Sequence, residues 1–429
     1  MAGGLGTRMR SAVPKHLHPL LGRRMVDWVL EAARPLEPSP LVVVTSPDTA
    51  DAFDGVKVAV QERPLGTGDA VRSARAALEG AKEVLVLSGD TPLLTTGLLV
   101  DLVAEHRSSP AVATVLSFIP DDVKSYGRIV RGADGRLLKI VEAADATPDE
   151  RAIGEANSSI YVFDAGSLWP ALERLTPANA QGELLLTDVV RDLVADGNRV
   201  AVHVAPDPSE TEGVNTRVEL AAAAAALRER ILEQHMLAGV TVVDPATTWI
   251  EPTVTLEPDA IVHPFSVLRG ATSVGRDAEV GPHVVAVDAR IGAGALVGPF
   301  CYLRPGTVLD AGSKAGTFVE VKNSTLGERA KVPHLAYIGD ADIGEGSNIG
   351  AGSITANLGH RPGEGKSRTR IGRNVKTGVD NTFVAPVTIG DDAWIAAGSV
   401  ITEDVPAGAL AVARVRQVNK EGRGGKRDG

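Results

Sequence analysis

Hydrophobic and polar positions follow two different patterns in the two halves of this 429-residue chain. In the first half, short aliphatic runs alternate with longer segments in which apolar residues recur at helical spacing. The runs that we expect to be buried parallel strands lie at 41–45, 83–89 and 111–118. The segments that we expect to be helices lie at 68–81 and 98–107. This alternation predicts an α/β domain.

In the second half an apolar residue returns at every sixth position. The positions are Val274, Val280, Ile291, Val297, Leu303, Leu309 and Ala315, then Ile371, Thr377, Phe383, Ile389, Ile395 and Ile401. A period of six fits neither a helix nor a sandwich strand, but it is typical of a β-solenoid in which each hexapeptide forms one flat side. A Gly/Val-rich β-sandwich is the alternative. Breaks in the register near 286–291 and 359–370 predict loops that leave the coil.

These patterns also predict where the chain divides. We expect a first domain over 1–217, a linker helix over the Ala/Glu/Arg-rich residues 218–238, and the solenoid over 239–417. The polar, glycine-rich residues 418–429 are expected to be a disordered tail.

Composition narrows the class of protein. The formal net charge of −10 argues against a general nucleic-acid binder, because phosphate contacts need clustered Lys and Arg. Cys301 is the only cysteine, so no intrachain disulfide can form, and we expect a reducing, cytoplasmic location. No apolar run is long enough to predict a membrane span, and no secretory signal is visible.

A glycine loop opens the chain, in the sequence MAGGLGTRMR. Gly3, Gly4 and Gly6 allow the backbone to approach a phosphate closely. Arg8 and Lys15 supply positive charge where a triphosphate would lose pyrophosphate. The alternative interpretation is a glycine turn beside surface charges.

Three further segments of the first half suit a nucleotide and a metal ion. Gln61 and the Leu65–Gly68 segment LGTG can hydrogen-bond a base edge. Asp90 directly follows a predicted strand, at the carboxyl end where α/β sheets bind ligands, and its carboxylate suits Mg²⁺. Asn215 offers a carbonyl oxygen as a second ligand. When each residue is considered alone, the alternative interpretations are a helix cap for Asp90 and a turn residue for Asn215.

The second half carries its own candidate chemistry between the coils. His334 is the candidate general base, because its unperturbed pKa lies near operating pH. Arg304 and Lys322 could cradle a sugar phosphate. The alternatives are a histidine satisfied at a coil corner and an exposed solenoid edge.

In this order the chain resembles the bifunctional N-acetylglucosamine-1-phosphate uridylyltransferase/glucosamine-1-phosphate acetyltransferase family, from residue 1 to about residue 417. The first half matches in the segments MAGGLGTRM, PKHLHPLLG, QERPLGTGDAV, LSGDTPLL, YGRIV, IVEAADAT, GEANSSIYVF, NAQGELLLTD and EGVNTR. The second half matches in VEVKNS, PHLAYIGDADIG and NIGAGSITAN. The resemblance implies a Rossmann-like nucleotidyltransferase domain, a linker helix and a left-handed parallel β-helix. It also implies a homotrimer whose solenoids pack side by side.

The implied reactions are acetyl transfer from acetyl-CoA to glucosamine-1-phosphate, then Mg²⁺-dependent uridylyl transfer from UTP to N-acetylglucosamine-1-phosphate. They yield pyrophosphate and UDP-N-acetylglucosamine, a precursor of peptidoglycan. The resemblance assigns the uridylyl substrates to Ala2, Gly3, Gly4, Arg8, Lys15, Gln61, Gly66, Thr67, Ser88, Gly89, Asp90, Gly127, Glu142, Asn157 and Asn215, with Mg²⁺ on Asp90 and Asn215.

For acetyl transfer the resemblance makes His334 the base. It assigns glucosamine-1-phosphate to Arg304, Lys322, Tyr337, Asn348 and Lys366. It assigns acetyl-CoA to Ala351, Asn357, Leu358, Val379, Ala397 and Arg414.

Several positions depart from the family pattern. Leu358 stands where the family has a tyrosine, in a stretch that continues through His360 and extra residues at 361–365. Val379 stands where a serine is usual, and Ser159 where a glycine is usual. The alternatives are therefore a nucleotidyltransferase of different sugar specificity with a weak or inactive acetyltransferase, or a non-catalytic scaffold. The family's glycine loop also follows an apolar strand. We therefore expect the genomic DNA just upstream to encode an in-frame Val/Ile/Leu run; the alternative is a protein that begins at its own active site.

Overall fold

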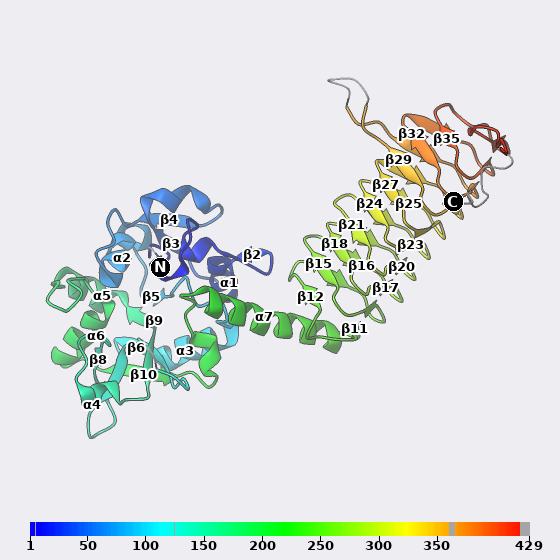
Figure 1. Ribbon diagram of the computed structural model, residues 1–429. Helices are drawn as coiled ribbons and strands as arrows, with labels where there is room; N and C mark the ends of the chain where they lie inside the picture. The colour runs from blue at the N-terminus through cyan, green and yellow to red at the C-terminus, as the bar shows by residue number, and fades with distance from the viewer. Residues whose placement is uncertain (5, 124, 360–364, 421–429) are drawn as a thin grey trace, which may run out of the picture. The chain divides into compact units, whose positions relative to one another are not determined.

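The computed structural model describes residues 1–4, 6–123, 125–359 and 365–420 (Figure 1). Internal contacts divide the chain into two compact units, Met1–Leu227 and Arg228–Gly429. Residues 421–429 of the predicted tail, and residues 361–364 of the predicted extra residues 361–365, lie outside the described residues.

Unit 1 is a mixed α/β unit, built on a six-stranded sheet in the order β10-β6-β9-β7-β8, with β5 also paired to β9. The strands of this sheet are β5 (Glu83–Val86), β6 (Ala113–Phe118), β7 (Arg128–Arg131), β8 (Leu137–Val141), β9 (Ala156–Asp164) and β10 (Val200–Val204). Two smaller sheets are β3 (Val42–Thr45) with β4 (Lys57–Val60), and β1 (Pro19–Leu20) with β2 (Arg23–Arg24).

Helices surround these sheets. The α-helices are α1 (Met25–Ala33), α2 (Thr67–Ser73), α3 (Thr96–Ser108), α4 (Pro148–Arg151), α5 (Ala165–Glu173) and α6 (Leu186–Ala195). Short 3₁₀ turns span Thr7–Met9, Lys15–Leu17, Arg34–Leu36, Pro47–Ala52, Arg75–Leu78 and Pro208–Thr211. The single helix predicted over 68–81 is wrong in its extent. α2 ends at Ser73, where the Ala74 amide bonds to the carbonyls of Val71 and Arg72 and tightens the last turn.

The prediction of parallel strands is only partly right. β3 pairs parallel with β4, and β6 pairs parallel with β10, but β9 runs antiparallel to β5, β6 and β7. Every residue of β6 is buried. Burial on both faces of a sheet produces a continuous apolar run, whichever way the neighbouring strand runs.

The glycine loop lies at the carboxyl ends of β3 and β5. The Ala2 amide donates to the Val44 carbonyl at 2.7 Å, and the Gly89 amide donates to the Met1 carbonyl at 2.8 Å. An apolar cavity of about 640 Å³ adjoins this point, and its lining includes Met1, Ala2 and residues of β3, β5 and α1. The loop is therefore held between two strands whose ends both face the candidate site.

Helix α7 (Arg217–Leu237) contributes residues to both units. Thr216 and Glu219 form a capping box at its start. The Glu219 amide donates to Thr216 Oγ1 at 3.2 Å, and the Thr216 amide donates to Glu219 Oε2 at 2.8 Å.

Unit 2 is a left-handed parallel β-helix whose three faces are parallel sheets (Figure 1). The first face holds β11 (Thr241–Val242), β14 (Ile261–Val262), β17 (Glu279–Val280), β20 (Leu296–Val297), β23 (Lys314–Thr317) and β26 (Lys331–His334), followed by β31 (Lys376–Thr377), β34 (Trp394–Ile395) and β36 (Leu410–Ala411). The second holds β12 (Trp249–Ile250), β15 (Val267–Arg269), β18 (Val285–Val287), β21 (Tyr302–Leu303), β24 (Glu320–Lys322), β27 (Tyr337–Gly339), β29 (Ile354–Ala356), β32 (Thr382–Val384) and β35 (Val400–Ile401). The third holds β13 (Thr255–Leu256), β16 (Ser273–Val274), β19 (Arg290–Ile291), β22 (Val308–Leu309), β25 (Thr325–Leu326), β28 (Ala341–Ile343), β30 (Thr369–Ile371) and β33 (Val387–Ile389).

The period-six residues point inward, as predicted. All thirteen of the predicted positions are buried. The loop predicted near 286–291 is wrong: β18 and β19 both stay in register with the next coil, and Ala286 and Ile291 are simply five positions apart rather than six. The second break is different, because the coil is interrupted between β29 and β30.

Left-handed residues mark the corners of the coil. Most such positions hold Gly, Asp or Asn, the residues that adopt positive φ most readily. One corner differs: Phe265, His283, Phe300, Phe318 and Leu335 all have φ between 49° and 59°. Their aromatic rings stack in sequence at centroid distances of 4.7, 4.7 and 5.1 Å. We call this column of bulky side chains the aromatic corner.

Candidate active sites

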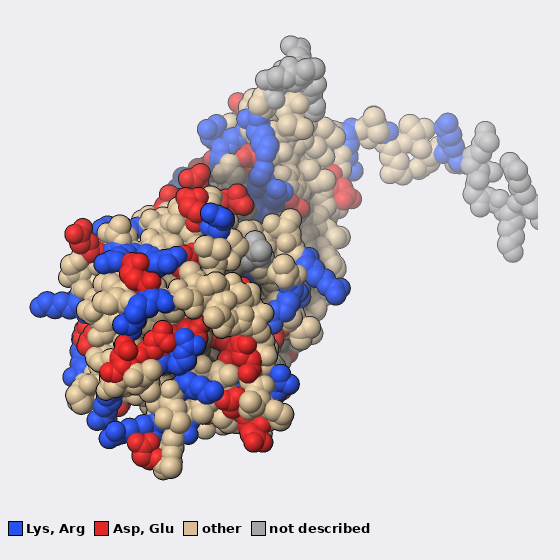
Figure 2. Space-filling model, turned by 90° about the vertical axis from the view of Figure 1, so that its left-hand side faces the viewer, with Lys and Arg blue, Asp and Glu red and all other residues tan. Residues whose placement is uncertain are grey.

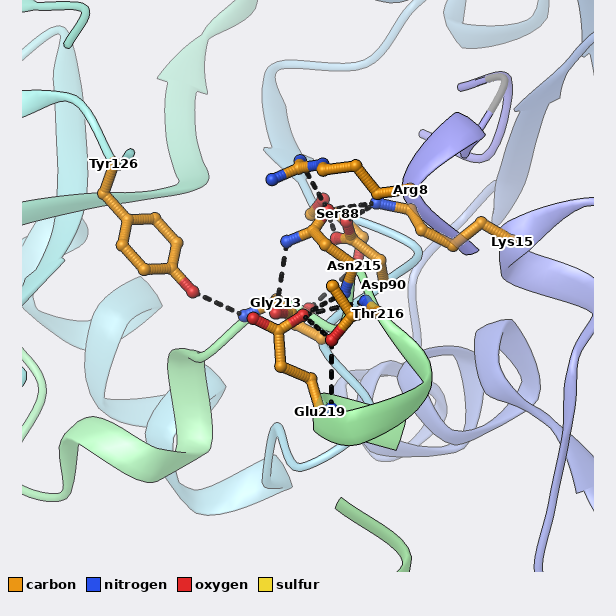
Figure 3. A network of polar contacts seen from close by, with 10 residues as sticks. Arg8, Lys15, Ser88, Asp90, Tyr126, Gly213, Asn215, Thr216 and Glu219 are labelled. Atoms are coloured by element: carbon orange, nitrogen blue, oxygen red, sulfur yellow. Dashed lines mark hydrogen bonds and ion pairs between the residues drawn. The ribbon is translucent and has the colours of Figure 1, made fainter. Parts of the chain in front are cut away.

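The polar centre of unit 1 brings together residues far apart in the sequence (Figure 3). Lys15 Nζ forms an ion pair with Asp90 Oδ2 and donates to Asn215 Oδ1 at 2.9 Å. Arg8 Nη2 donates to the same Asn215 oxygen at 2.9 Å. One Lys15 nitrogen thus contacts both oxygens that we expect to bind Mg²⁺.

Neighbouring groups hold these side chains in place. Ser88 Oγ donates to Asp90 Oδ1 at 2.6 Å, and the Asp90 carbonyl accepts from the Val214 amide at 2.8 Å. The backbone N–H of Asn215 donates to Glu219 Oε2 at 2.8 Å, so the cap of α7 also orients Asn215 (Figure 3). Tyr126 Oη accepts from the Gly213 amide at 3.0 Å on the other side of the same turn.

The charge of this centre is set by the ion pair. Burial disfavours the charged form of Asp90, but the Lys15 ammonium and the hydrogen bond from Ser88 outweigh that effect and hold the pKa of Asp90 below its usual value. The carboxylate is therefore ionised at neutral pH, as a metal ligand requires.

The donor set fits magnesium. Asp90 and Asn215 offer a carboxylate and an amide oxygen, which are hard ligands, and Mg²⁺ binds through one or two protein oxygens while keeping waters and substrate phosphates. Across the described residues, no group of three or more His, Cys, Asp or Glu could hold a metal ion.

The segment expected to bind the uracil base of the nucleotide packs beside the glycine loop. Gln61 Nε2 donates to the Gly66 carbonyl at 3.1 Å and to Asp69 Oδ2 at 2.9 Å. A Cβ on Gly3 would lie 3.3 Å from Gln61 Oε1, so the two segments touch. Gly66 has φ +117°, and a Cβ there would lie 2.5 Å from the Leu184 carbonyl oxygen, so this turn needs glycine.

Other predicted residues of this loop region also lie here. Ala2 is buried, and nothing described lies within 4 Å of a Cβ placed on Gly4. A Cβ on Gly89 would meet the Met1 carbonyl oxygen at 2.8 Å. Thr67 Oγ1 accepts from the Leu186 amide at 2.9 Å and thereby ties α2 to α6.

The residues expected to hold the sugar form a separate group. The Asn157 amide donates to the Gly127 carbonyl at 2.9 Å, and a Cβ on Gly127 would lie 3.6 Å from Glu142 Oε2. Burial raises the pKa of Glu142, although a hydrogen bond from Thr187 opposes the shift. Ser159, which replaces a glycine, has φ 62° and lies where the β6–β9 register shifts. A positive φ of this size favours glycine over serine on backbone grounds alone.

In unit 2, several predicted sugar-phosphate residues gather on one face. Arg304 Nη1 donates to Glu320 Oε1 at 2.8 Å. Lys322 and Lys366 contact each other, and this contact, followed by desolvation, lowers the pKa of Lys322. Tyr337 Oη accepts from Asn357 Nδ2 at 3.5 Å. The cluster is cationic and open, as a phosphate-binding surface must be.

His334 and the residues expected to line the coenzyme form one column. β23 pairs with β26, bridges join Lys331 to Asn348 and Asn348 to Lys376, and β31 pairs with β34. Carried along the coil, this register places His334 level with the residues Ala351, Val379 and Ala397 in successive coils. His334 is exposed and is not sealed inside the β-helix.

The remaining predicted acetyltransferase residues lie near this column or beside the coil. Asn348 is part of the register itself. Leu358 is 64% exposed and pairs antiparallel with Lys366 across the insertion. Val379 is 48% exposed. Arg414 lies in the exposed segment after β36.

The sequence interpretation missed Tyr126, Glu219, Glu320 and Asp340. Tyr126 stands in the matched segment YGRIV and Glu320 in VEVKNS, but neither was singled out. Thr216 and Glu219 have the Thr-x-x-Glu spacing of a capping box, so their pairing could have been predicted from the sequence. Asp340 stands in the matched segment PHLAYIGDADIG, but its alignment with Asn323 and Asn357, 17 positions to either side, was not noticed.

Figure 2 shows basic and acidic side chains interspersed over the face in view. Among the helices that the structure describes, none is both long and apolar enough to cross a lipid bilayer.

The fold and the two sites define a class: a nucleotidyltransferase unit followed by a β-helix that carries a second site. Residues 1–185 match the family model described as the MobA-like NTP transferase domain. The chain is 50% identical to the bifunctional protein GlmU of Streptomyces avermitilis, over 98% of this chain and 92% of that protein. It is 49% identical to the bifunctional protein GlmU of Mycobacterium tuberculosis, over 98% and 90% respectively.

The chain therefore belongs to the GlmU family of bifunctional enzymes. The family predicted from the sequence is confirmed, and so is the prediction of a two-activity transferase of UDP-N-acetylglucosamine synthesis.

Proposed function

We propose that the two reactions of this bifunctional enzyme are divided between the units: uridylyl transfer in unit 1 and acetyl transfer in unit 2. The observation that carries this division is the convergence of Lys15, Asp90 and Asn215 in unit 1. His334 lies in a column of its own in the other unit. Each site therefore uses residues that the other lacks.

In unit 1 the sugar phosphate oxygen attacks the α-phosphorus of UTP, and the bond to the β-phosphate breaks to release pyrophosphate. Lys15 and Arg8 stabilise the triphosphate by charge, while Gln61 and Gly66 hold the uracil. Glu142 and Asn157 orient the sugar. Positioning and charge neutralisation supply the catalysis, and no covalent intermediate is needed.

Asp90 and Asn215 would hold Mg²⁺, which when bound neutralises charge on the phosphates. Because Lys15 now contacts both oxygens, it must turn away from them toward the phosphates when substrate and metal bind.

In unit 2 the amine of glucosamine-1-phosphate attacks the thioester carbonyl of acetyl-CoA. The carbon–sulfur bond breaks, the thiol leaves, and His334 takes the proton from the amine. Arg304, Lys322 and Lys366 would bind the phosphate. The column of Ala351, Val379 and Ala397 would lie along the coenzyme, where small side chains leave room.

We further propose that three copies pack through the aromatic corner. Phe265, Phe300, Phe318 and Leu335 are each about half exposed or more, so the corner presents a continuous apolar surface. It runs directly beside His334, so a neighbouring copy would also close the acetyl site. A buried single cysteine supports a cytoplasmic location.

Two assays on the full chain test the division. With UTP, Mg²⁺ and N-acetylglucosamine-1-phosphate the protein should release pyrophosphate. With acetyl-CoA and glucosamine-1-phosphate it should release free thiol. Lack of thiol release would support the alternative in which Leu358 and Val379 mark an inactive acetyltransferase. Pyrophosphate release with other sugar phosphates only would indicate a different specificity.

A further inference from the structure

Asp340 occupies a corner of the β-helix between β27 and β28, close to Lys322 and Lys366. It is 7% exposed and has φ 49°. The same corner holds Asp288 and Asn323 in earlier coils, also with positive φ. The turn alone explains why Asp or Asn stands there, but it does not explain where the carboxylate points.

The carboxylate of Asp340 joins two asparagines from different coils. Asn323 Nδ2 donates to Oδ1 at 2.6 Å, and Asn357 Nδ2 donates to Oδ2. Asn323 follows Lys322, and Asn357 precedes Leu358. One buried carboxylate therefore connects the sugar-phosphate side of the site with the coenzyme side.

Cations surround this carboxylate. Burial disfavours its charge, but hydrogen bonds from Asn323 and Asn357 and the nearby Lys322 and Lys366 outweigh burial and lower the pKa of Asp340. In return Asp340 raises the pKa of Lys322, against the effect of Lys366 and Arg304. The other charged or titratable groups around it are Arg368, Asp342 and Tyr337.

We propose that Asp340 is a positioning residue for acetyl transfer: it clamps Asn323 and Asn357 and keeps Lys322 and Lys366 together as a charged pair that receives the sugar phosphate. This inference rests on the proposed function of unit 2. Two like charges in contact repel each other, and a buried carboxylate beneath them offsets that repulsion before substrate arrives.

Asp340→Asn distinguishes this positioning role from a direct effect of the negative charge of Asp340 on binding of the phosphate. Asparagine suits the left-handed turn, so the backbone is kept, but its amide cannot accept from both asparagines. If Asp340 acted only through its charge, removing a negative group would strengthen binding of an anion and lower the KM. Positioning predicts the opposite, because the clamp is lost.

The experiment measures thiol release by the full chain over a range of pH. We expect Asp340→Asn to lower kcat/KM for glucosamine-1-phosphate by about tenfold, the size of one charge-assisted hydrogen bond. The loss should lie mainly in a raised KM, and the basic limb of the pH profile should move to lower pH.

Asp288→Asn is the matched control, because Asp288 occupies the same corner and only caps the Ala271 amide, at 2.8 Å. It should stay within twofold of the parent. A normal or lowered KM in Asp340→Asn, an unmoved pH limb, or an equal loss in Asp288→Asn overturns the proposal. If Asp340→Asn does not fold, Asn323→Gly removes one donor at a compatible φ, and an unchanged KM then overturns it.

A parent chain that releases no thiol would contradict the proposed function of unit 2 instead. The two failures are therefore distinguishable.

Discussion

The two sites differ in how far their own chain completes them. In unit 1, Lys15, Asp90 and Asn215 are partly buried and already paired with one another. In unit 2, His334 lies exposed on the outside of a rigid coil. The first group is preorganised by internal contacts, whereas the second lies on an open surface of the coil.

The units also place their residues by different means. Unit 1 joins segments about two hundred positions apart through individual hydrogen bonds, as between Lys15 and Asn215. Unit 2 stacks its residues through the register of the coil, as between Thr317 and His334. A substitution in unit 1 should therefore disturb a network, and one in unit 2 should disturb mainly its own contact.

The largest effect is expected for Asp90→Asn. The change keeps the shape but removes the metal ligand and the partner of Lys15, so pyrophosphate release should fall by about a thousandfold. Thiol release should be unchanged. The exposed carboxylate of Asp101 on α3 provides the control, since Asp101→Asn should leave both rates alone. Loss of both activities in Asp90→Asn would show that the two units do not act independently.

His334→Ala should lower thiol release by at least about a hundredfold, because general-base catalysis is lost. The pyrophosphate assay should give the parent rate. His263→Ala changes another histidine of the β-helix and should leave acetyl transfer intact. Parent-like acetylation by His334→Ala would show that the base has been misassigned.

Phe318→Asp tests the aromatic corner. Phe318 is 56% exposed, and Asp tolerates its left-handed φ, so the coil itself should be kept. We expect the trimer to dissociate in sedimentation experiments and acetyl transfer to fall by about tenfold, with uridylyl transfer unaffected. Leu138→Asp, at an exposed apolar position of β8, is the control. A variant that stays trimeric would place the interface elsewhere.

Glu142→Gln should stabilise unit 1. A carboxyl whose pKa is raised in the folded state contributes stability below its unfolded pKa, and that contribution is lost as the pH rises through the folded pKa. Gln keeps an acceptor for Thr187 without the charge, so we expect a gain of about 1 kcal/mol at pH 7 and none near pH 4, measured by urea unfolding. An equal gain at both values of pH would exclude the titration of Glu142 as its cause.

The smallest effect concerns Cys301 inside the β-helix. Burial raises the pKa of the Cys301 thiol to about 12, so a thiol reagent should not label the native protein near pH 8. One thiol should react after unfolding in denaturant. Rapid labelling of the native chain would show that the interior of the coil opens readily.

Sequence reasoning predicted unit 2 better than unit 1. A period of six depends only on which residues face the interior, and Ile371, Phe383 and Ile389 are buried as expected. In unit 1 the aliphatic run of β5 can be recognised in the sequence. Its antiparallel pairing with β9 cannot, because the residues of β9 lie about eighty positions further along the chain. Burial can be predicted from a local pattern, whereas strand pairing cannot.

The same distinction applies to the sites. The resemblance pointed to Lys15, Asp90 and Asn215, and the structure brings them together. Asp340 was not singled out, because only the register of the folded coil shows that it meets Asn323 and Asn357, which lie 17 positions before and after it.

The central claim is that two independent sites share one chain. Mixing the two single variants tests it most directly. Supplied with glucosamine-1-phosphate, acetyl-CoA, UTP and Mg²⁺, neither Asp90→Asn nor His334→Ala alone should release appreciable pyrophosphate. Mixed together they should restore release, because acetylated product made by the first can reach the intact uridylyl site of the second. A mixture as inactive as its components would contradict the account.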